Sequence, residues 1–183
     1  MVKLLTILVA LFIANELLYA QLQPNIIFIF TDDHGFNDLE SHDKFDEVQM
    51  PNVESMVENG VNCSAAYVTA PQCTPSRAGL ITGQYQQNFG LNSNKDLPLN
   101  PNILTIPDRL SKLGYITGMV GKWHLGYEEP NLPNDRGFTF FHGFLGDMMD
   151  DYWTHLRGGV NWMRLNKKTI TPKGHATEIF SRW

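Results

Sequence analysis

A cysteine and an arginine lie one helical turn apart in the segment from Cys73 to Gly83, and together they could hold a nucleophile beside an anion. Thr74 is suited to cap a helix, Pro75 suits its first turn, and Gly83 can end it about two turns later. Cys73 would therefore lie at a helix N-terminus, where backbone amides and the helix dipole favour an anion, including a thiolate. Arg77 adds a planar guanidinium suited to a tetrahedral oxyanion. Outside this context, Cys73 would be an ordinary half-buried thiol.

A lysine and a histidine stand two residues apart in the segment 121–126, whose sequence is GKWHLG. This segment follows a predicted strand, and in an extended chain Lys122 and His124 project to the same side while Trp123 packs opposite. Lys122 could neutralise an anionic oxygen, and His124 could hydrogen-bond the same group or transfer a proton to a leaving oxygen. Without the cysteine segment, the pair would indicate surface charge and a structural histidine.

Two adjacent carboxylates, Asp32 and Asp33, follow a continuous apolar run from Pro24 to Phe30. The run is typical of a strand buried on both faces, so the carboxylates would lie where the chain leaves the sheet. Hard oxygen ligands in such a place suit Ca²⁺ or Mg²⁺. By themselves, two aspartates after a strand could equally form a turn or a helix cap.

The order Cys-x-Pro-Ser-Arg that begins at Cys73, with Gly83 six residues after the arginine, resembles the signature of the type I sulfatases. The segment 121–126 resembles the second signature of the same family. The resemblance extends from about Pro24 to the end of the chain. It implies an alkaline-phosphatase/sulfatase-like α/β fold and hydrolysis of sulfate monoesters.

The resemblance also assigns roles to four residues. It implies that a formylglycine-generating enzyme oxidises Cys73 to formylglycine during secretion. One hydroxyl of the hydrated aldehyde would attack the sulfur of the ester, and the second would then expel the bound sulfate. Arg77, Lys122 and His124 would be the other catalytic residues, and Lys122 would also bind the substrate.

A calcium site follows from the resemblance rather than from spacing. Similar sulfatases bind Ca²⁺ through an aspartate pair, an oxygen of the formylglycine, and an Asp-Asn pair much farther along their chains. Asp32, Asp33 and Cys73 are therefore the metal ligands that we expect here. The later pair, and the further histidine and lysine of the family, have no counterpart that we identify in this sequence.

The stretch from Asp150 to His155 (DDYWTH) resembles a tyrosine- and histidine-containing stretch of N-acetylgalactosamine-4-sulfatase, also called arylsulfatase B. This resemblance implies that His155 lies near the substrate. Thr154 replaces the serine usual in that stretch, and a surface histidine remains the alternative.

The elements that must position these residues alternate between strands and short helices. Residues 52–60 predict a helix capped by Asn52 and ended by a left-handed Gly60, and a second strand is expected from Val61. Residues 105–114 predict another helix, with Thr105 as its cap and Leu110 and Leu113 as its buried stripe.

A third strand is expected from Tyr115 to Val120. This alternation predicts an α/β fold with a mostly parallel sheet and helices on both faces. Beyond about Arg136 the periodicity weakens, and no second complete domain is visible. We therefore expect residues 21–183 to be the N-terminal part of a sulfatase catalytic domain that is incomplete at its C-terminus.

The first twenty residues have the features of a signal peptide. Lys3 supplies a positive charge, Leu4 to Ile13 is apolar, and a plausible cleavage site precedes residue 21. An uncleaved anchor is the alternative, but the run is shorter than the ~20 residues that span a bilayer. We expect the secretory pathway, ending in a lysosome or outside the cell, without a stable membrane anchor.

Net charge and cysteine content bear on the partners and the covalent modifications of the chain. The 14 Lys and Arg against 19 Asp and Glu give a net charge of -5, which argues against a nucleic-acid partner. Cys63 and Cys73 allow one disulfide at most, and we expect Cys63 to be a buried structural thiol. Asn62-Cys63-Ser64 is also a possible N-glycosylation acceptor, which would make the protein a glycoprotein.

The sequence leaves three functions open. The first is a sulfuric ester hydrolase of the arylsulfatase type, acting on a sulfated small molecule such as a steroid or aryl ester, or on a glycosaminoglycan sugar. The second keeps the nucleophile but hydrolyses phosphonate or phosphate esters. The third is a non-catalytic, truncated sulfatase fragment.

Overall fold

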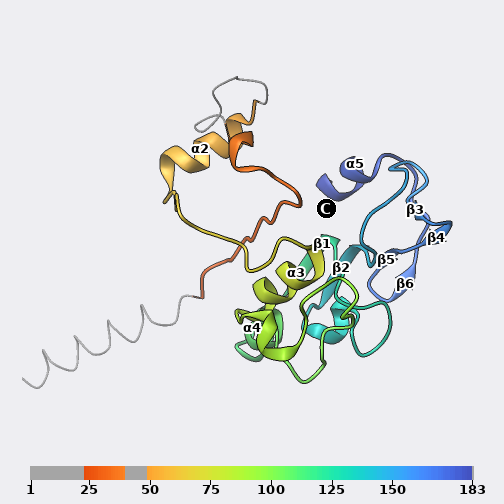
Figure 1. Cartoon of the computed structure of the whole chain (residues 1–183). Coiled ribbons are helices and arrows are strands. Elements are labelled where there is room, and N and C mark those ends of the chain that lie inside the picture. Colours follow the sequence, from red (N-terminus) through yellow and green to blue (C-terminus); the bar gives the residue numbers. More distant parts are fainter. Residues whose placement is uncertain (1–22, 40–48, 183) are drawn as a thin grey trace, which may run out of the picture. The chain divides into compact units, whose positions relative to one another are not determined.

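The computed structural model describes residues 23–39 and 49–182. The chain divides into two units, Met1–Gly60 and Val61–Trp183, whose elements are coloured along the sequence in Figure 1. The predicted signal peptide lies outside the described residues. No helix in the described ranges is both long and apolar enough to cross a bilayer.

The first unit contains the short 3-10 helix η1 (Phe36–Asp38) and the helix α2 (Pro51–Asn59). The strand predicted over residues 24–30 does not form, and Ile27 and Ile29 are 87% and 71% exposed. An apolar run favours a strand, but a strand also needs a neighbour that pairs with its backbone, and no described strand pairs with these residues.

Helix α2 begins and ends differently from the prediction. Met50 is the N-cap and Pro51 opens the helix, so Asn52 lies inside the first turn and does not cap it. Gly60 is extended, with φ −121°, and is not in the left-handed conformation. Met56 in this helix is 62% exposed.

The second unit contains all the strands of the described residues. Its helices are α3 (Cys73–Thr82), η2 (Gln86–Phe89), α4 (Ile106–Lys112), η3 (Pro133–Arg136) and α5 (Ala176–Ser181). Its strands are β1 (Gly118–Lys122), β2 (Phe140–Phe144), β3 (Leu156–Arg157), β4 (Val160–Asn161), β5 (Met163–Leu165) and β6 (Lys168–Thr169). The strand expected from Val61 is absent from this described part of the chain.

A four-stranded sheet in the order β1-β2-β5-β6 forms the centre of the second unit (Figure 1). Strands β1 and β2 are parallel, with Val120 opposite His142, while β5 and β6 continue the sheet in antiparallel pairs. Strands β3 and β4 form a separate antiparallel hairpin. The α/β class is therefore confirmed, with a sheet that is partly parallel.

Glycine at position 143 permits the close approach of β1 and β2. An added Cβ at Gly143 would collide with the carbonyl oxygen of Gly121. At Gly118, on the same pair of strands, an added Cβ would meet Phe140 only at 3.8 Å, which is an ordinary contact.

Helix α4 starts as its sequence predicts. The Thr105 side chain accepts a hydrogen bond from the Asp108 amide, and the Asp108 carboxylate accepts one from the Thr105 amide at 2.9 Å. This reciprocal capping box satisfies two backbone donors at the helix start. Leu113, however, is 62% exposed, so the predicted buried stripe is wrong at that position.

Two groups of buried side chains make up the core. The larger surrounds Trp123 and Phe141, and the smaller links β5 to α5 through Met163 and Ala176. Arg136 is 2% exposed beside the larger group, where its guanidinium donates to Asn131 Oδ1 at 3.0 Å and to main-chain carbonyls. Burial lowers the pKa of Arg136, against the opposing charges of Asp108 and Asp135.

Candidate functional site

Helix α3 starts at Cys73, which is half-buried and has a free thiol. Gln72 is the N-cap, so the prediction that Thr74 caps the helix is wrong by two residues. Gly83 ends the helix in the left-handed conformation, with φ 66°, as predicted. Cys73 therefore lies at a helix N-terminus, although the helix is longer than expected.

One backbone N–H group at the start of α3 donates to the oxygen of a side-chain amide. The backbone N–H of Thr74 donates to Asn94 Oδ1 at 3.0 Å. The backbone N–H of Asn94 donates in turn to Gln72 Oε1 at 3.1 Å. These bonds tie the loop around Asn94 to the first turn of α3. The Thr74 hydroxyl is buried and has no hydrogen-bond partner among the described residues.

Arg77 connects the two segments that the sequence singled out. Its Nη1 atom donates to the carbonyl oxygen of Lys122 at 2.7 Å, which joins α3 to the last residue of β1. Arg77 also lies four residues after Cys73, so the two share one face of the helix. The structure therefore brings the helix that carries Cys73 and Arg77 to the end of the strand that carries Lys122.

The backbone after β1 is held by the last residue of β2 and the residue that follows it. The Trp123 amide donates to Phe144 O at 2.9 Å, and the His124 amide donates to Leu145 O at 3.2 Å. Trp123 packs in the core, 1% exposed, and its indole donates to Asn131 O at 2.8 Å. The interior position predicted for Trp123 is therefore confirmed.

His124 departs from the extended geometry that the sequence predicts. Strand β1 ends at Lys122, and His124 has a left-handed φ of 57°, so the simple alternation of an extended chain stops before it. Its side chain is 2% exposed. A left-handed residue other than glycine is uncommon, and here it redirects the chain at the end of the strand.

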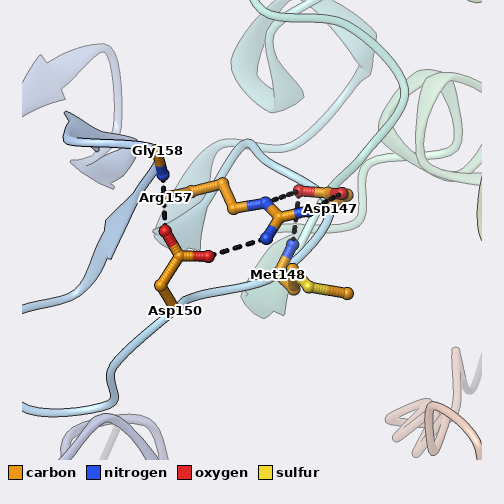
Figure 2. Close-up of polar contacts among 5 residues, drawn as sticks. All are labelled: Asp147, Met148, Asp150, Arg157 and Gly158. Carbon is orange, nitrogen blue, oxygen red and sulfur yellow. Dashed lines mark hydrogen bonds and ion pairs between the residues drawn. The ribbon is translucent and has the colours of Figure 1, made fainter.

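Sequence reasoning missed a cluster of one arginine and two aspartates (Figure 2). Arg157 donates to both carboxylate oxygens of Asp147, at 3.1 and 3.2 Å, and to Asp150 Oδ1 at 2.7 Å. Asp150 also accepts the Gly158 amide at 2.6 Å. These bonds fix the start of the β3–β4 hairpin to the loop that follows β2.

Asp147 of this cluster also feels the charge of His124. Burial works to raise the pKa of Asp147, but hydrogen bonds from Arg157 and the Met148 amide and the charges of Arg157 and His124 outweigh it, so the pKa is lowered. Asp147 thus links the Arg157 cluster electrostatically to His124. No sequence signal marks this link, because Asp147 and Arg157 are ten residues apart in a segment of weak periodicity.

His155 is buried at the end of the aromatic stretch. It is 2% exposed with φ 61°, and its Nε2 atom lies 2.9 Å from the carbonyl oxygen of Gly174. This contact joins the loop before β3 to the loop before α5. Its predicted role beside the substrate stays a prediction.

The predicted metal ligands are divided between the two units. Asp32 and Asp33 are exposed residues of the first unit, and Asp33 has a φ of 56°. Cys73 belongs to the second unit. Within the described ranges, no three His, Cys, Asp or Glu side chains form a group that could hold a metal ion. Two carboxylates alone fall short of the six to eight oxygens that calcium takes.

Cys63 does not have the environment that the sequence predicts. Its thiol is free and the residue is exposed, whereas we expected a buried structural cysteine. Residues 61–68 are exposed throughout and form no strand, so this segment provides no interior position for a thiol.

Comparison with known proteins identifies the family. The chain is 44% identical to arylsulfatase J of Mus musculus over 142 residues, which are 74% of this chain and 23% of that protein. The structure of Ps i-CgsB matches with a TM-score of 0.79 and 30% identity, covering 88% of this chain and 40% of that one. A protein solved in complex with its substrate D-glucosamine-2-N,6-O-disulfate matches with a TM-score of 0.68 and 29% identity, covering 86% of this chain and 29% of that one.

The chain thus spans about a quarter of the length of the curated relatives that it matches. The family model described as Sulfatase matches residues 24–180, which include every predicted site residue. The chain therefore belongs to the sulfatase family.

Proposed function

We propose that this chain carries the nucleophile of a sulfatase that hydrolyses sulfate monoesters, with Cys73 converted to formylglycine. The observation that carries the proposal is the hydrogen bond from Arg77 to the Lys122 carbonyl. It joins the helix that presents the nucleophile to the strand end that presents a second cation. A tetrahedral oxyanion bound between them would meet two positive charges beside a helix N-terminus.

Each residue has a distinct part in the proposed reaction. The first turn of α3 would hold the side chain of residue 73 at the positive end of the helix dipole. As formylglycine, that side chain supplies a hydrated aldehyde, whose hydroxyl attacks the sulfur of the ester. Arg77 and Lys122 would stabilise the charge on the sulfate oxygens, and His124 would transfer a proton to the leaving oxygen.

Asp32 and Asp33 have the carboxylate oxygens that calcium prefers, and we propose them as contributors to a calcium site that also includes residue 73. Within the described residues, no group of three or more His, Cys, Asp or Glu side chains completes such a site. When bound, the ion would add positive charge beside the sulfate oxygens that Arg77 and Lys122 would also contact.

A sulfated sugar is the substrate class that we favour. One structural relative was solved with D-glucosamine-2-N,6-O-disulfate as its substrate, and a curated relative, 39% identical over 127 residues, is an N-acetylgalactosamine-6-O-sulfatase of Bacteroides thetaiotaomicron. We further propose that the protein matures in the secretory pathway, where the formylglycine-generating enzyme would act on Cys73.

Mass spectrometry of the protein secreted from cells that contain the formylglycine-generating enzyme tests the proposal. We expect the peptide with residue 73 to have the mass of the aldehyde, while the peptide with Cys63, an exposed free thiol, keeps the mass of cysteine. An unmodified thiol at position 73 would remove the proposed nucleophile.

Kinetics then decide between the proposed reaction and its alternatives. We expect faster turnover of an aryl sulfate than of an aryl phosphate, loss of turnover in Cys73→Ala, and no change in Cys63→Ser. A preference for the phosphate would favour a phosphate ester hydrolase. No turnover of either ester by the formylglycine form would favour a non-catalytic fragment.

A further inference from the structure

Three aromatic rings gather outside the residues of the proposed reaction. The Tyr152 ring stacks on the His175 ring with centroids 5.3 Å apart and planes 20° apart. The Trp153 ring meets His175 edge to face, also at 5.3 Å, with planes 78° apart. Tyr152 and Trp153 remain 55% and 64% exposed. Large aromatic rings that stay exposed in a fixed arrangement are typical of binding surfaces.

The turn that carries Tyr152 and Trp153 is held in place by hydrogen bonds. Asp151 Oδ1 accepts the amides of Trp153 and Thr154 at 2.9 and 2.7 Å, and these bonds lower the pKa of Asp151. The His155 amide donates to Asp151 O at 2.9 Å. The turn is therefore fixed by the carboxylate and the carbonyl of Asp151, without burial of its rings.

The turn is also tied to the loop that carries His175. The Ala176 amide donates to Tyr152 O at 2.9 Å, and His155 Nε2 lies 2.9 Å from Gly174 O. His175 Nδ1 accepts the Thr177 amide at 3.3 Å, which leaves Nε2 to carry the proton of the neutral ring. No hydrogen-bond partner of Nε2 is found among the described residues. Two rigid loops thus present aromatic faces together with a polar N–H group.

We propose that Tyr152, Trp153 and His175 form a stacking surface for the sugar ring of the sulfated substrate. A pyranose has one apolar face of C–H groups, which packs on an aromatic ring, and a rim of hydroxyl groups, which His175 Nε2 can bond. The proposal rests on the proposed function and adds a sugar subsite to it. His155 then acts as a positioning residue, because its contact with Gly174 holds the residue before His175 against the loop of Tyr152 and Trp153.

The Arg157 cluster connects this surface to the proposed reaction centre. Asp150, the residue immediately before the turn, shares Arg157 with Asp147, and Asp147 interacts electrostatically with His124. Arg157 thus ties the residue before the turn to Asp147, which feels the charge of His124. A sugar ring that stacks on this surface would belong to the same substrate molecule as the sulfate group at the proposed reaction centre.

NMR of the tryptophan indole N–H groups in the full chain tests the proposal without needing catalysis. We expect D-glucosamine-2-N,6-O-disulfate and unsulfated D-glucosamine both to shift the Trp153 signal. The Trp123 signal should stay constant, because that indole is buried and bonded to Asn131. Inorganic sulfate should leave Trp153 unchanged. No shift with either sugar, or the same shift with inorganic sulfate, would overturn the stacking surface.

The affinity for the disulfated sugar can be compared between two variants by following the NMR signals of the His175 ring. Trp153→Leu keeps an apolar side chain but loses the aromatic face, and we expect the dissociation constant of the disulfated sugar to rise about tenfold. Tyr85→Leu, which changes a 67% exposed tyrosine outside the cluster, should leave it unchanged. Equal affinity in both variants would contradict the proposal. A protein that binds the sugars at Trp153 but hydrolyses no sulfate ester would refute the proposed function alone.

Discussion

Replacing Arg77 with methionine should destabilise the second unit and abolish the proposed turnover, because the arginine joins two elements and, in the proposed reaction, also stabilises the sulfate oxygens. The lost bond from Nη1 to Lys122 O is 2.7 Å long, half-buried, and made by a charged donor. Such hydrogen bonds contribute about 1.5–3 kcal/mol, so we expect the free energy of unfolding to fall by about 2 kcal/mol. With a urea m-value of about 2 kcal/mol/M, the midpoint should fall by about 1 M.

Urea denaturation followed by tryptophan fluorescence measures this fall in the free energy of unfolding, and two further variants serve as controls. Arg109→Met removes an exposed arginine of α4 and should change the unfolding free energy by less than about 0.5 kcal/mol. Arg77→Lys keeps the charge but lacks the planar fork of donors, so it should retain part of the stability and lose about 100-fold in kcat. An Arg77→Met protein that unfolds at the wild-type urea concentration would refute the structural role of this bond.

Three other changes test separate parts of the structure. The folded-state pKa of Asp147 is lowered, so its ionised carboxylate stabilises the fold above the unfolded pKa of about 3.9. This stabilisation is lost as the pH falls through the folded-state pKa. The Tm of Asp147→Asn should therefore decline less steeply below about pH 5 than the Tm of the wild type. Calorimetric titration should give a calcium dissociation constant no tighter than about 1 mM, weakened further in Asp32→Asn and Asp33→Asn, whereas submicromolar binding would contradict the shortage of ligands. Gly143→Ala should cost about 3 kcal/mol in chemical denaturation, while Gly118→Ala should cost less than about 1 kcal/mol; equal effects would disprove the close approach of β1 and β2.

The sequence predicted best the features that depend on neighbouring residues. The start of α4 follows from Thr105 and Asp108, three residues apart, and the end of α3 follows from Gly83. Both are decided within one helical turn, where capping and left-handed glycine act locally. The start of α3 was missed by two residues because Gln72, which is not a usual capping residue, precedes Cys73.

The strands were harder to predict because pairing is not a local property. The apolar run at residues 24–30 has the composition of a buried strand but no described pairing partner, whereas β5 and β6 are short and carry little periodic signal. In the candidate site, the cysteine and lysine-histidine segments were singled out by their residue types and spacing together with their resemblance to two sulfatase signatures. The Arg157 cluster was not, since its members come together only when the β3–β4 hairpin folds.

The frame of the candidate site is built largely from backbone atoms. Arg77 donates to the carbonyl of Lys122, and the amides of Trp123 and His124 donate to carbonyls at the end of β2 and just after it. Exchanging the side chain at Lys122 or His124 therefore leaves these acceptors and donors in place, whereas exchanging Arg77 removes one of them. Among the residues proposed for catalysis, Arg77 therefore has a second part, because its side chain also holds the helix of the nucleophile against the sheet.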